Sequence, residues 1–510
     1  MKKLWLVTIF FANIAIAQKS DKAQKFAQYI TEQGLKDKLT ILAGDEMEGR
    51  ETATEGQKKA AAFIEAHFKK HGLLPGNGSS YQQVYNVYQD ELINQQLKVN
   101  GELFLLDKDF SFSLANVATC DFDFSNAVFV GYGLSSDKQN DYKNIDVKGK
   151  VVIVLDGLPK DAPTPTAQTG TRVMGPGTAF AKAGTAKTNG AIGLIVINSD
   201  FPKKTPMNPK GNMTINRPNV TSFFTITVSE KVGAALLGRT FVPTKKQFEE
   251  INAGSYFAET KLLIQKNTAT LESSNVIGIV EGSDKKDEYI FITGHYDHLG
   301  KRGDVIYYGA DDDGSGTTAV MQLAETFAKA KAKGVGPRRT MVFMAVSGEE
   351  KGLWGSKFYA DNPTFPLAKT SVDLNIDMIG RIDPTYKGDS NNYVFAIGED
   401  KLSTELQPIT DSVNKWYLNM EVDRRYNDPK DPNRFYFRSD HYNFAAKGIP
   451  IIFYFNGVHK DYHKPTDTVD KINFNLMYKR SLLVYYTAWE MANKNEMLKR
   501  DLPLSAVPAR

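Results

Sequence analysis

Four short apolar runs in the C-terminal half constrain the fold of this chain more than any other feature. Helical stretches such as 317–331 lie between them. Strands that are buried on both faces read as continuous apolar runs, as in the parallel sheets of α/β proteins. The pattern therefore predicts an α/β fold with a mixed, mainly parallel central sheet flanked by helices. The four runs are 289–293, 340–346, 372–376 and 449–455.

Each run is followed by a histidine or a carboxylate. In open α/β sheets, ligands bind beyond the carboxyl ends of the strands, so these segments form the expected site. Five of the seven histidines fall between residues 295 and 463. The candidate segments are Gly294–His298, Gly309–Gly316 at the start of a helix, Ser347–Glu350, Asp377–Met378 and Gly457–Asp467.

The donor types in these segments favour zinc over other metals. Imidazole and carboxylate suit zinc, whereas an all-oxygen set would indicate magnesium or calcium. The donors are too many for one closed tetrahedral ion, and they suit two ions that lie about 3.5–4 Å apart and share a carboxylate. The spacing of a calcium-binding EF-hand is not met, because the aspartates at 311–313 are adjacent and no glutamate ends the loop.

These motifs resemble those of the M28 family of zinc peptidases. The resemblance covers nearly the whole mature chain, including the Gly49–Arg50 region, and it implies the zinc exopeptidase fold. A middle block, 121–263, has short β-like runs and no histidine, and it resembles an inserted, β-rich protease-associated (PA) domain. The matching elements occur in the family's order: Gly294–Asp297, Gly309–Gly316, Gly348–Glu350, Asp377–Met378 and His463–Asp467.

The resemblance implies a role for each matching side chain. Two Zn²⁺ ions would be bound by five residues: one ion by His295 and Asp377, the other by Glu350 and His463, and both by the bridging Asp312. Glu349 would be the general base. The Asp297 carboxylate would accept the ring N–H of His295 and orient that ring. Tyr462 and His441 are weaker candidates, for contacts with the substrate or behind the ligands.

The implied activity is that of a dizinc exopeptidase, and aminopeptidase is the first choice. Two zinc ions lower the pKa of a shared water towards neutrality. Glu349 would take its proton, the metal-bridged hydroxide would attack the peptide carbonyl, and Glu349 would return the proton to the leaving amine.

Other functions stay open beside this one. A dizinc carboxypeptidase or dipeptidase on the same fold is the main alternative. A hydrolase of a non-peptide substrate, such as a phosphoester, is a further one. A glutaminyl cyclase uses one zinc ion and is disfavoured by the full set of five ligands. A non-catalytic binding protein would have lost ligands, and all of them are present in this sequence.

The first 17 residues are typical of a secretion signal. Lys2 and Lys3 precede an apolar stretch, and Ala15–Ala17 forms a small-x-small cleavage site. The chain is therefore expected to be exported, to the periplasm or beyond the cell, without a membrane span after cleavage. The single cysteine, Cys120, excludes an intrachain disulfide.

The length of 510 residues predicts more than one domain. The expected peptidase domain comprises 18–120 and 264–510, and the insertion comprises 121–263. The net charge of +4 gives no argument for nucleic acid as a partner. A peptide substrate is the expected partner, and the sequence leaves the oligomeric state open.

Overall fold

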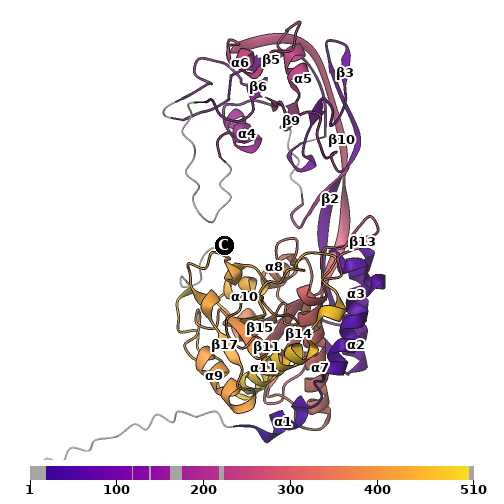
Figure 1. Cartoon of the computed structure of the whole chain (residues 1–510), viewed down its shortest axis with the longest axis vertical. Coiled ribbons are helices and arrows are strands. Elements are labelled where there is room, and N and C mark those ends of the chain that lie inside the picture. Colours follow the sequence, from indigo (N-terminus) through magenta and orange to yellow (C-terminus); the bar gives the residue numbers. More distant parts are fainter. Residues whose placement is uncertain (1–18, 118, 137–138, 161–174, 218–222, 505–510) are drawn as a thin grey trace, which may run out of the picture. The chain divides into compact units, whose positions relative to one another are not determined.

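The computed structural model describes residues 19–504, apart from 118, 137–138, 161–174 and 218–222 (Figure 1). The predicted signal peptide, 1–17, lies outside these residues. The described residues pack into two compact units. The first comprises the chain up to residue 85 and from 272 onwards, and the second comprises 86–271.

The first unit is built on a mixed sheet whose four central strands are parallel. These neighbours are, in order, β14 (Arg339–Val346), β11 (Lys285–His295), β15 (Thr370–Ile376) and β18 (Ile451–Phe455). On either side they have antiparallel neighbours, β10 (Gly254–Val280) and β16 (Tyr393–Ile397). The edges are β1 (Leu74–Pro75) and β17 (Glu421–Asp423). This arrangement confirms the predicted mixed, mainly parallel sheet.

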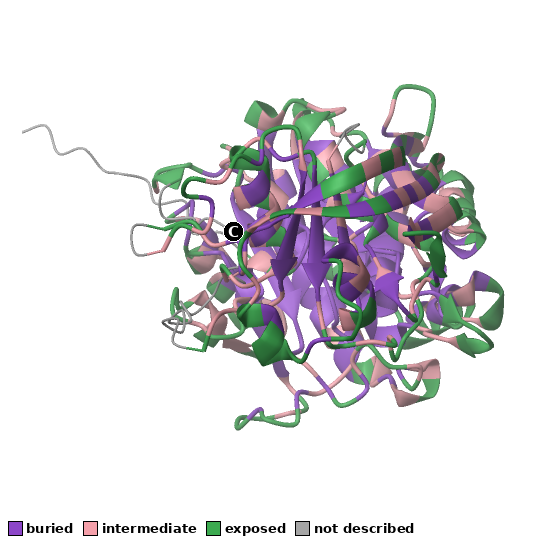
Figure 2. Ribbon diagram, turned by 90° about the horizontal axis from the view of Figure 1, so that it is seen from above, coloured by how far each residue is buried: buried purple, intermediate pink, exposed green. Residues whose placement is uncertain are grey.

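The central strands form because their side chains are apolar on both faces. All residues of β14, β15 and β18 are buried. Figure 2 colours buried residues purple, and strands are among the purple segments. Each fully buried Val, Ile or Phe side chain contributes about 1.5–3 kcal/mol of hydrophobic free energy. Three helices that pack on these strands are α7 (Gly316–Ala332), α10 (His441–Ala445) and α11 (Phe474–Asn493).

The other α-helices of the first unit lie mainly near its N-terminal part and in its connections. Thr31 and Thr54 each cap a helix, because the side-chain oxygen accepts a main-chain N–H of the first turn. These helices are α1 (Asp21–Ala27), α2 (Glu32–Leu42), α3 (Glu55–Lys70), α8 (Trp354–Asp361) and α9 (Leu406–Tyr417).

The second unit is a β-rich body with its own core. Four of its strands are parallel and lie side by side in this order: β5 (Cys120–Phe129), β6 (Val151–Leu155), β7 (Gly193–Ile197) and β9 (Phe224–Val228). β4 (Phe110–Ser111) pairs with β9, and part of β10 pairs with β5. β2 (Gln82–Val99) pairs with β3 (Glu102–Phe104) and β8 (Lys210–Thr214). The α-helices are α4 (Ala179–Thr188), α5 (Glu230–Leu236) and α6 (Lys245–Glu249).

The division between the units falls inside two strands. β2 continues across residues 85 and 86, and β10 continues across residues 271 and 272. A boundary within a strand leaves no linker-like change of composition in the sequence. The domain boundaries drawn from composition, at 120/121 and 263/264, stay a prediction.

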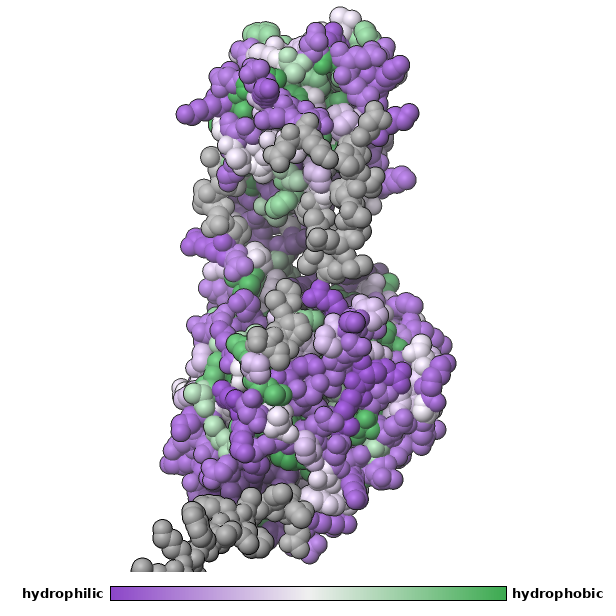
Figure 3. Space-filling model, turned by 90° about the vertical axis from the view of Figure 1, so that its left-hand side faces the viewer, coloured by the Kyte–Doolittle hydropathy of each residue, from purple (hydrophilic) through white to green (hydrophobic). Residues whose placement is uncertain are grey.

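No helix in the described part of the chain combines the length and the apolar character that a membrane span needs. On the face drawn in Figure 3, hydrophilic residues predominate, and apolar residues form small separate patches. Scattered apolar side chains are ordinary on protein surfaces, so these patches need no functional explanation.

Candidate metal centre

The candidate residues lie in loops at the carboxyl ends of the parallel strands. His295 is the last residue of β11, and Asp377 directly follows β15. Glu349 and Glu350 lie in the loop that follows β14, and Asp312 lies in the short turn before α7. Because parallel strands end at the same edge of a sheet, the fold brings these side chains together.

Asp312 belongs to two groups of potential ligands. The first group comprises His295, Asp312 and Asp377, and its donor atoms lie within 4.8 Å of one another. His295 Nε2 is 3.2 Å from Asp312 Oδ1 and 3.6 Å from Asp377 Oδ1. The second group comprises Asp312, Glu350 and His463. His463 Nε2 is 3.1 Å from Asp312 Oδ2 and 3.2 Å from Glu350 Oε2.

A further imidazole, that of His298, lies beside the second group. Its Nδ1 is 2.9 Å from Glu350 Oε1 and 3.8 Å from Asp312 Oδ2. The side chain is fully buried. The sequence predicted no role for His298, although its position three residues after His295 was a signal that could have suggested one.

Several buried atoms in this region have no hydrogen-bond partner among the described residues. They are His295 Nε2, Asp312 Oδ2, Glu350 Oε1 and both ring nitrogens of His298. An unpaired buried polar atom costs free energy, and divalent cations would satisfy the carboxylate oxygens and one nitrogen of each ring. Nitrogen and oxygen donors of this kind suit zinc. The residues present therefore fit metal ions at both groups.

The charges of the centre also favour a cation. Burial lowers the pKa of His463, but its contacts with Asp312 and Glu350 outweigh burial and raise the pKa to about 10. Burial opposes the charged form of His295 too, yet the surrounding carboxylates raise its pKa well above the usual value. Burial raises the pKa of Glu349 well above its usual range. The carboxylates that favour protonated imidazoles here would equally favour a bound cation.

Comparison with known proteins decides the family. Residues 275–488 match Peptidase family M28, and residues 113–236 match the PA domain. Residues 275–488 form a domain of peptidase family M28. Its M28 residues include all five predicted metal ligands, and its PA match lies within the β-rich second unit.

Individual relatives of this M28 protein match shorter stretches. A probable zinc metalloprotease of Leptosphaeria maculans is 40% identical over 114 residues, which cover 21% of this chain and 24% of that protein. Aminopeptidase YwaD of Bacillus subtilis is 28% identical over 205 residues, which cover 40% of this chain and 37% of that protein. The chain thus matches well under half the length of these curated relatives.

A solved structure matches this M28 chain over nearly its whole length. The aminopeptidase from Aneurinibacillus sp. strain AM-1 has a TM-score of 0.54 and 20% sequence identity. The match covers 93% of this chain and 97% of that chain. At this identity the likeness shows the fold, which agrees with the predicted α/β class and inserted PA domain.

Asp297 of the M28 centre makes a different contact from the predicted one. The ring Nδ1 of His295 lies 3.1 Å from the main-chain oxygen of Asp297, whereas the carboxylate Oδ1 lies 3.8 Å away. That carboxylate instead accepts the Thr52 hydroxyl at 2.7 Å and the Glu349 main-chain N–H at 3.2 Å. The expected hydrogen bond is therefore replaced, because two other donors occupy the carboxylate.

Tyr462 lies at the M28 centre, and His441 does not line the hollow beside it. That hollow is lined by Tyr462, by the carboxylates Asp312, Glu349 and Asp377, and by Met378, Phe435, Arg438, Phe453, Phe455 and Val458. The Tyr462 ring stacks on His463 with centroids 3.8 Å apart, and its hydroxyl accepts from Arg438 at 3.1 Å. His441 is buried against Phe453, with Nε2 2.8 Å from the Tyr436 carbonyl.

Two residues outside the predicted ligand set hold the M28 loops in place. Asp467 Oδ2 accepts the main-chain N–H groups of Asp311 and Asp312 at 3.0 and 3.2 Å. Arg50 is fully buried, and its guanidinium donates to four main-chain carbonyls. These carbonyls belong to Leu42, Tyr296, Tyr308 and Gly309. Both residues lie in motifs that the family resemblance covers, but motif identity alone did not indicate these contacts.

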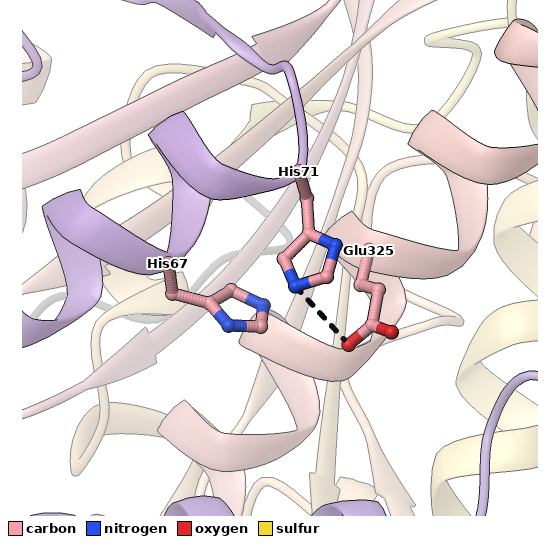
Figure 4. Close-up of side chains that lie close together, drawn as sticks. All are labelled: His67, His71 and Glu325. Carbon is pink, nitrogen blue, oxygen red and sulfur yellow. Dashed lines mark ion pairs between the residues drawn. The ribbon is translucent and has the colours of Figure 1, made fainter.

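A third group of potential ligands comprises His67 on α3, His71 directly after that helix, and Glu325 on α7 (Figure 4). His71 Nε2 is 3.7 Å from Glu325 Oε2. The same carboxylate contacts Lys38 at 3.3 Å and Lys329 at 2.5 Å. Two ammonium groups already balance the carboxylate, so the arrangement fits an ion-pair network better than a metal site.

Proposed function

We propose that this protein is an exported dizinc exopeptidase that acts as an aminopeptidase. The observation that carries the proposal is the position of Asp312, whose two oxygens face two separate groups of ligands. A shared carboxylate of this kind suits a pair of metal ions. The printed names of two relatives, a zinc metalloprotease and an aminopeptidase, support the same class of reaction.

The proposed ligands divide between the two groups. His295 and Asp377 would hold one zinc ion, Glu350 and His463 would hold the other, and Asp312 would contribute to both positions. When bound, the ions lower the pKa of a water molecule and polarise the substrate carbonyl. The burial of Asp312 and His295 keeps bulk water away from these donors and strengthens their electrostatic interactions.

Glu349 is the proposed general base. Its carboxylate lines the hollow, and its Oε2 lies 3.9 Å from His295 Nε2. The contact of its main-chain N–H with the Asp297 carboxylate fixes the loop that carries it. Its raised pKa suits a group that accepts a proton from water and later donates it to the leaving amine. Tyr462 lines the same hollow and has a hydroxyl that would donate to the developing oxyanion.

The hollow supports an aminopeptidase more than a carboxypeptidase. Glu349 is the carboxylate of the hollow that is not a proposed ligand, and it would accept a hydrogen bond from the amine at a peptide N-terminus. One residue favours the alternative, a dizinc carboxypeptidase or dipeptidase: Arg438 lines the same hollow, and a guanidinium binds carboxylates in a two-pronged contact.

The first test measures metal content and hydrolysis on the same sample. The mature chain is purified, its metal is counted by plasma emission, and leucyl-nitroanilide is assayed with and without a chelator. We expect two zinc ions per chain and activity that the chelator abolishes. Zinc binding without hydrolysis of any peptide substrate would support a binding protein or a hydrolase of another substrate.

Blocked substrates separate the two exopeptidase types. N-acetyl-leucyl-nitroanilide lacks the free amine, so an aminopeptidase cleaves it far more slowly than leucyl-nitroanilide. A carboxypeptidase instead requires a free C-terminal carboxylate and cleaves N-blocked dipeptides. Cleavage of the N-blocked dipeptides, with no cleavage of leucyl-nitroanilide, would replace the aminopeptidase proposal by its alternative.

Export is the part of the proposal that rests on residues 1–17 alone. Their basic start, apolar stretch and small residues are the supporting pattern. N-terminal sequencing of the protein recovered outside the cytoplasm of an expressing bacterium tests it. The expected first residue is Gln18, and an intact Met1 on a cytoplasmic product would contradict export.

A further inference from the structure

We propose that His298 is a sixth ligand residue, which binds the metal ion of the second group through its Nδ1 atom. The inference rests on the proposed function, since it concerns one of the two proposed ions. It gives this ion two imidazoles, from His298 and His463, and two carboxylates, from Asp312 and Glu350. The ion of the first group has one imidazole.

The position of the His298 ring carries the inference. Its Nδ1 is 2.9 Å from Glu350 Oε1 and 3.8 Å from Asp312 Oδ2, and the donor atoms of these three residues lie within 4.8 Å of one another. All three of these atoms are buried and have no hydrogen-bond partner among the described residues. Three unpartnered ligand atoms that converge in a buried space are the arrangement that a metal ion satisfies.

His298 Nδ1 and Glu350 Oε1 lie close together without a hydrogen bond, which is expected of two ligands of one metal ion but not of a direct hydrogen-bonded pair. A ring N–H that donated to Glu350 would point at its oxygen, but this pair, although 2.9 Å apart, lacks hydrogen-bond geometry. Two atoms that each bind one zinc ion at about 2.0–2.2 Å lie close together while both point at the ion rather than at each other. His295 Nε2 and Asp312 Oδ1, a predicted ligand pair 3.2 Å apart, lie in the first group in a comparable way.

The surroundings fix the His298 ring in this orientation. Its main-chain N–H donates to the Arg50 carbonyl at 3.2 Å. On one side the ring packs against Gly309, where a Cβ atom would lie 2.5 Å from ring atoms Cγ and Cδ2. Gly309 also has a φ of 54°, a conformation that favours glycine. A larger residue at this position would displace the ring, so the glycine preserves a preformed ligand position.

The extra imidazole makes the two metal positions unequal. Nitrogen donors raise the affinity of a site for zinc, cobalt or nickel relative to manganese or magnesium. We therefore expect the second group to hold zinc more tightly than the first. Calorimetric titration of the apoprotein with zinc should resolve two binding steps of different affinity.

The variants His298→Asn and His298→Ala test the role directly. Each variant is stripped of metal, titrated with zinc against a competing chelator, and checked for folding by circular dichroism. We expect the number of tightly bound ions to fall from two to one per chain. Removal of a residue that only hydrogen-bonds to a ligand typically weakens metal binding about 10–100-fold. A larger loss of zinc affinity, confined to one of the two metal positions, therefore indicates that His298 is a direct ligand.

His441→Asn is the matched control. His441 is equally buried, but its Nε2 lies beside a main-chain carbonyl rather than beside carboxylates. This variant should retain two tightly bound ions. Two ions of unchanged affinity in both His298 variants would overturn the ligand role while leaving the dizinc proposal intact. Failure of the wild-type chain to bind zinc would overturn the proposed function itself.

Cobalt substitution tests the wild-type chain without any variant. Imidazole N–H protons on histidines bound to Co²⁺ give strongly shifted proton NMR signals. Loading both positions should shift the ring protons of three histidines, His295, His298 and His463. Shifted ring signals from only two histidines, assigned with a sample labelled in its histidine rings, would show that His298 is no ligand even if the variants misfold.

Discussion

Asp467 holds the main chain of Asp312: its Oδ2 accepts the Asp312 N–H at 3.2 Å and is itself fully buried. Asp467 lies four residues after His463, so this contact joins the loop of one proposed ligand to the loop of the bridging carboxylate. The proposed spacing between the two groups therefore depends on a residue that binds no metal.

Removal of the Asp467 carboxylate should loosen the centre. In Asp467→Ala the N–H groups of Asp311 and Asp312 lose their shared acceptor, so zinc affinity should fall about 10–100-fold. Competition with a fluorescent zinc chelator measures the change. Asp470→Ala removes an exposed carboxylate nearby and should leave the affinity unchanged. Equal affinities in the two variants would show that this contact does not position Asp312.

Substitution of Glu349 should impair catalysis, whereas substitution of the adjacent Glu350 should impair metal binding. Glu349→Gln should lower kcat by about 10²–10⁴-fold and keep both zinc ions, because it removes only the proton acceptor. Glu350→Gln should weaken the second ion, because it removes a charged ligand. Steady-state kinetics and metal counts on the same preparations measure both effects. Loss of zinc from Glu349→Gln, with zinc retained in Glu350→Gln, would exchange the two roles.

Arg50 should be important for stability as well as for the site. An ammonium offers three donors from a single atom, whereas the Arg50 guanidinium reaches four carbonyls. Each buried acceptor without a donor costs about 1–3 kcal/mol, so Arg50→Lys should lower the free energy of unfolding by at least that amount. Urea unfolding followed by circular dichroism measures the difference. The exposed Arg302→Lys serves as the control, and a loss of equal size there would show that Arg50 has no special role.

His67 should contribute to the pH dependence of the free energy of unfolding. Burial, reinforced by Lys38, lowers its pKa in the folded chain from 6.5 to about 4. The unfolded chain therefore binds a proton in this range that the folded chain does not, and stability falls as the pH drops from 6.5 to about 4. His67→Gln cannot take up this proton, so its unfolding free energy should fall less steeply over that window.

Urea titrations at several pH values compare the two proteins. Loss of zinc in acid affects both alike and cancels in the difference between them. Identical slopes for wild type and His67→Gln would contradict the lowered pKa. Above pH 7 the two proteins should show parallel behaviour, since His67 is neutral in both the folded and the unfolded chain there.

The sheet, and the closeness of the candidate side chains at one of its edges, could be foreseen from sequence for one physical reason. Strands buried on both faces, such as β14 and β15, have uninterrupted apolar sequences, and parallel strands place their carboxyl ends together. His295 ends such a strand, Asp377 directly follows one, and Glu350 lies shortly after another. Their proximity therefore follows from the local pattern and the topology without knowledge of any loop.

The contacts that the sequence did not foresee depend on how loops fold back. The Asp297 carboxylate accepts from Thr52, which is more than two hundred residues away in the chain, and this partner replaces the predicted one. The position of His298 depends on the Arg50 carbonyl and on the space beside Gly309. None of these pairings leaves a periodic or compositional signal, so a single sequence does not reveal them.

The Arg50 contacts join segments of the chain that are translated far apart in time. Arg50 is made early, but two of its carbonyl partners, Tyr308 and Gly309, are made more than two hundred and fifty residues later, and His463 follows later still. A nascent chain therefore lacks a complete centre until residue 463 has been translated. The proposed activity would depend on early and late segments of the chain folding together, and no shorter N-terminal fragment would contain the full set of candidate ligands.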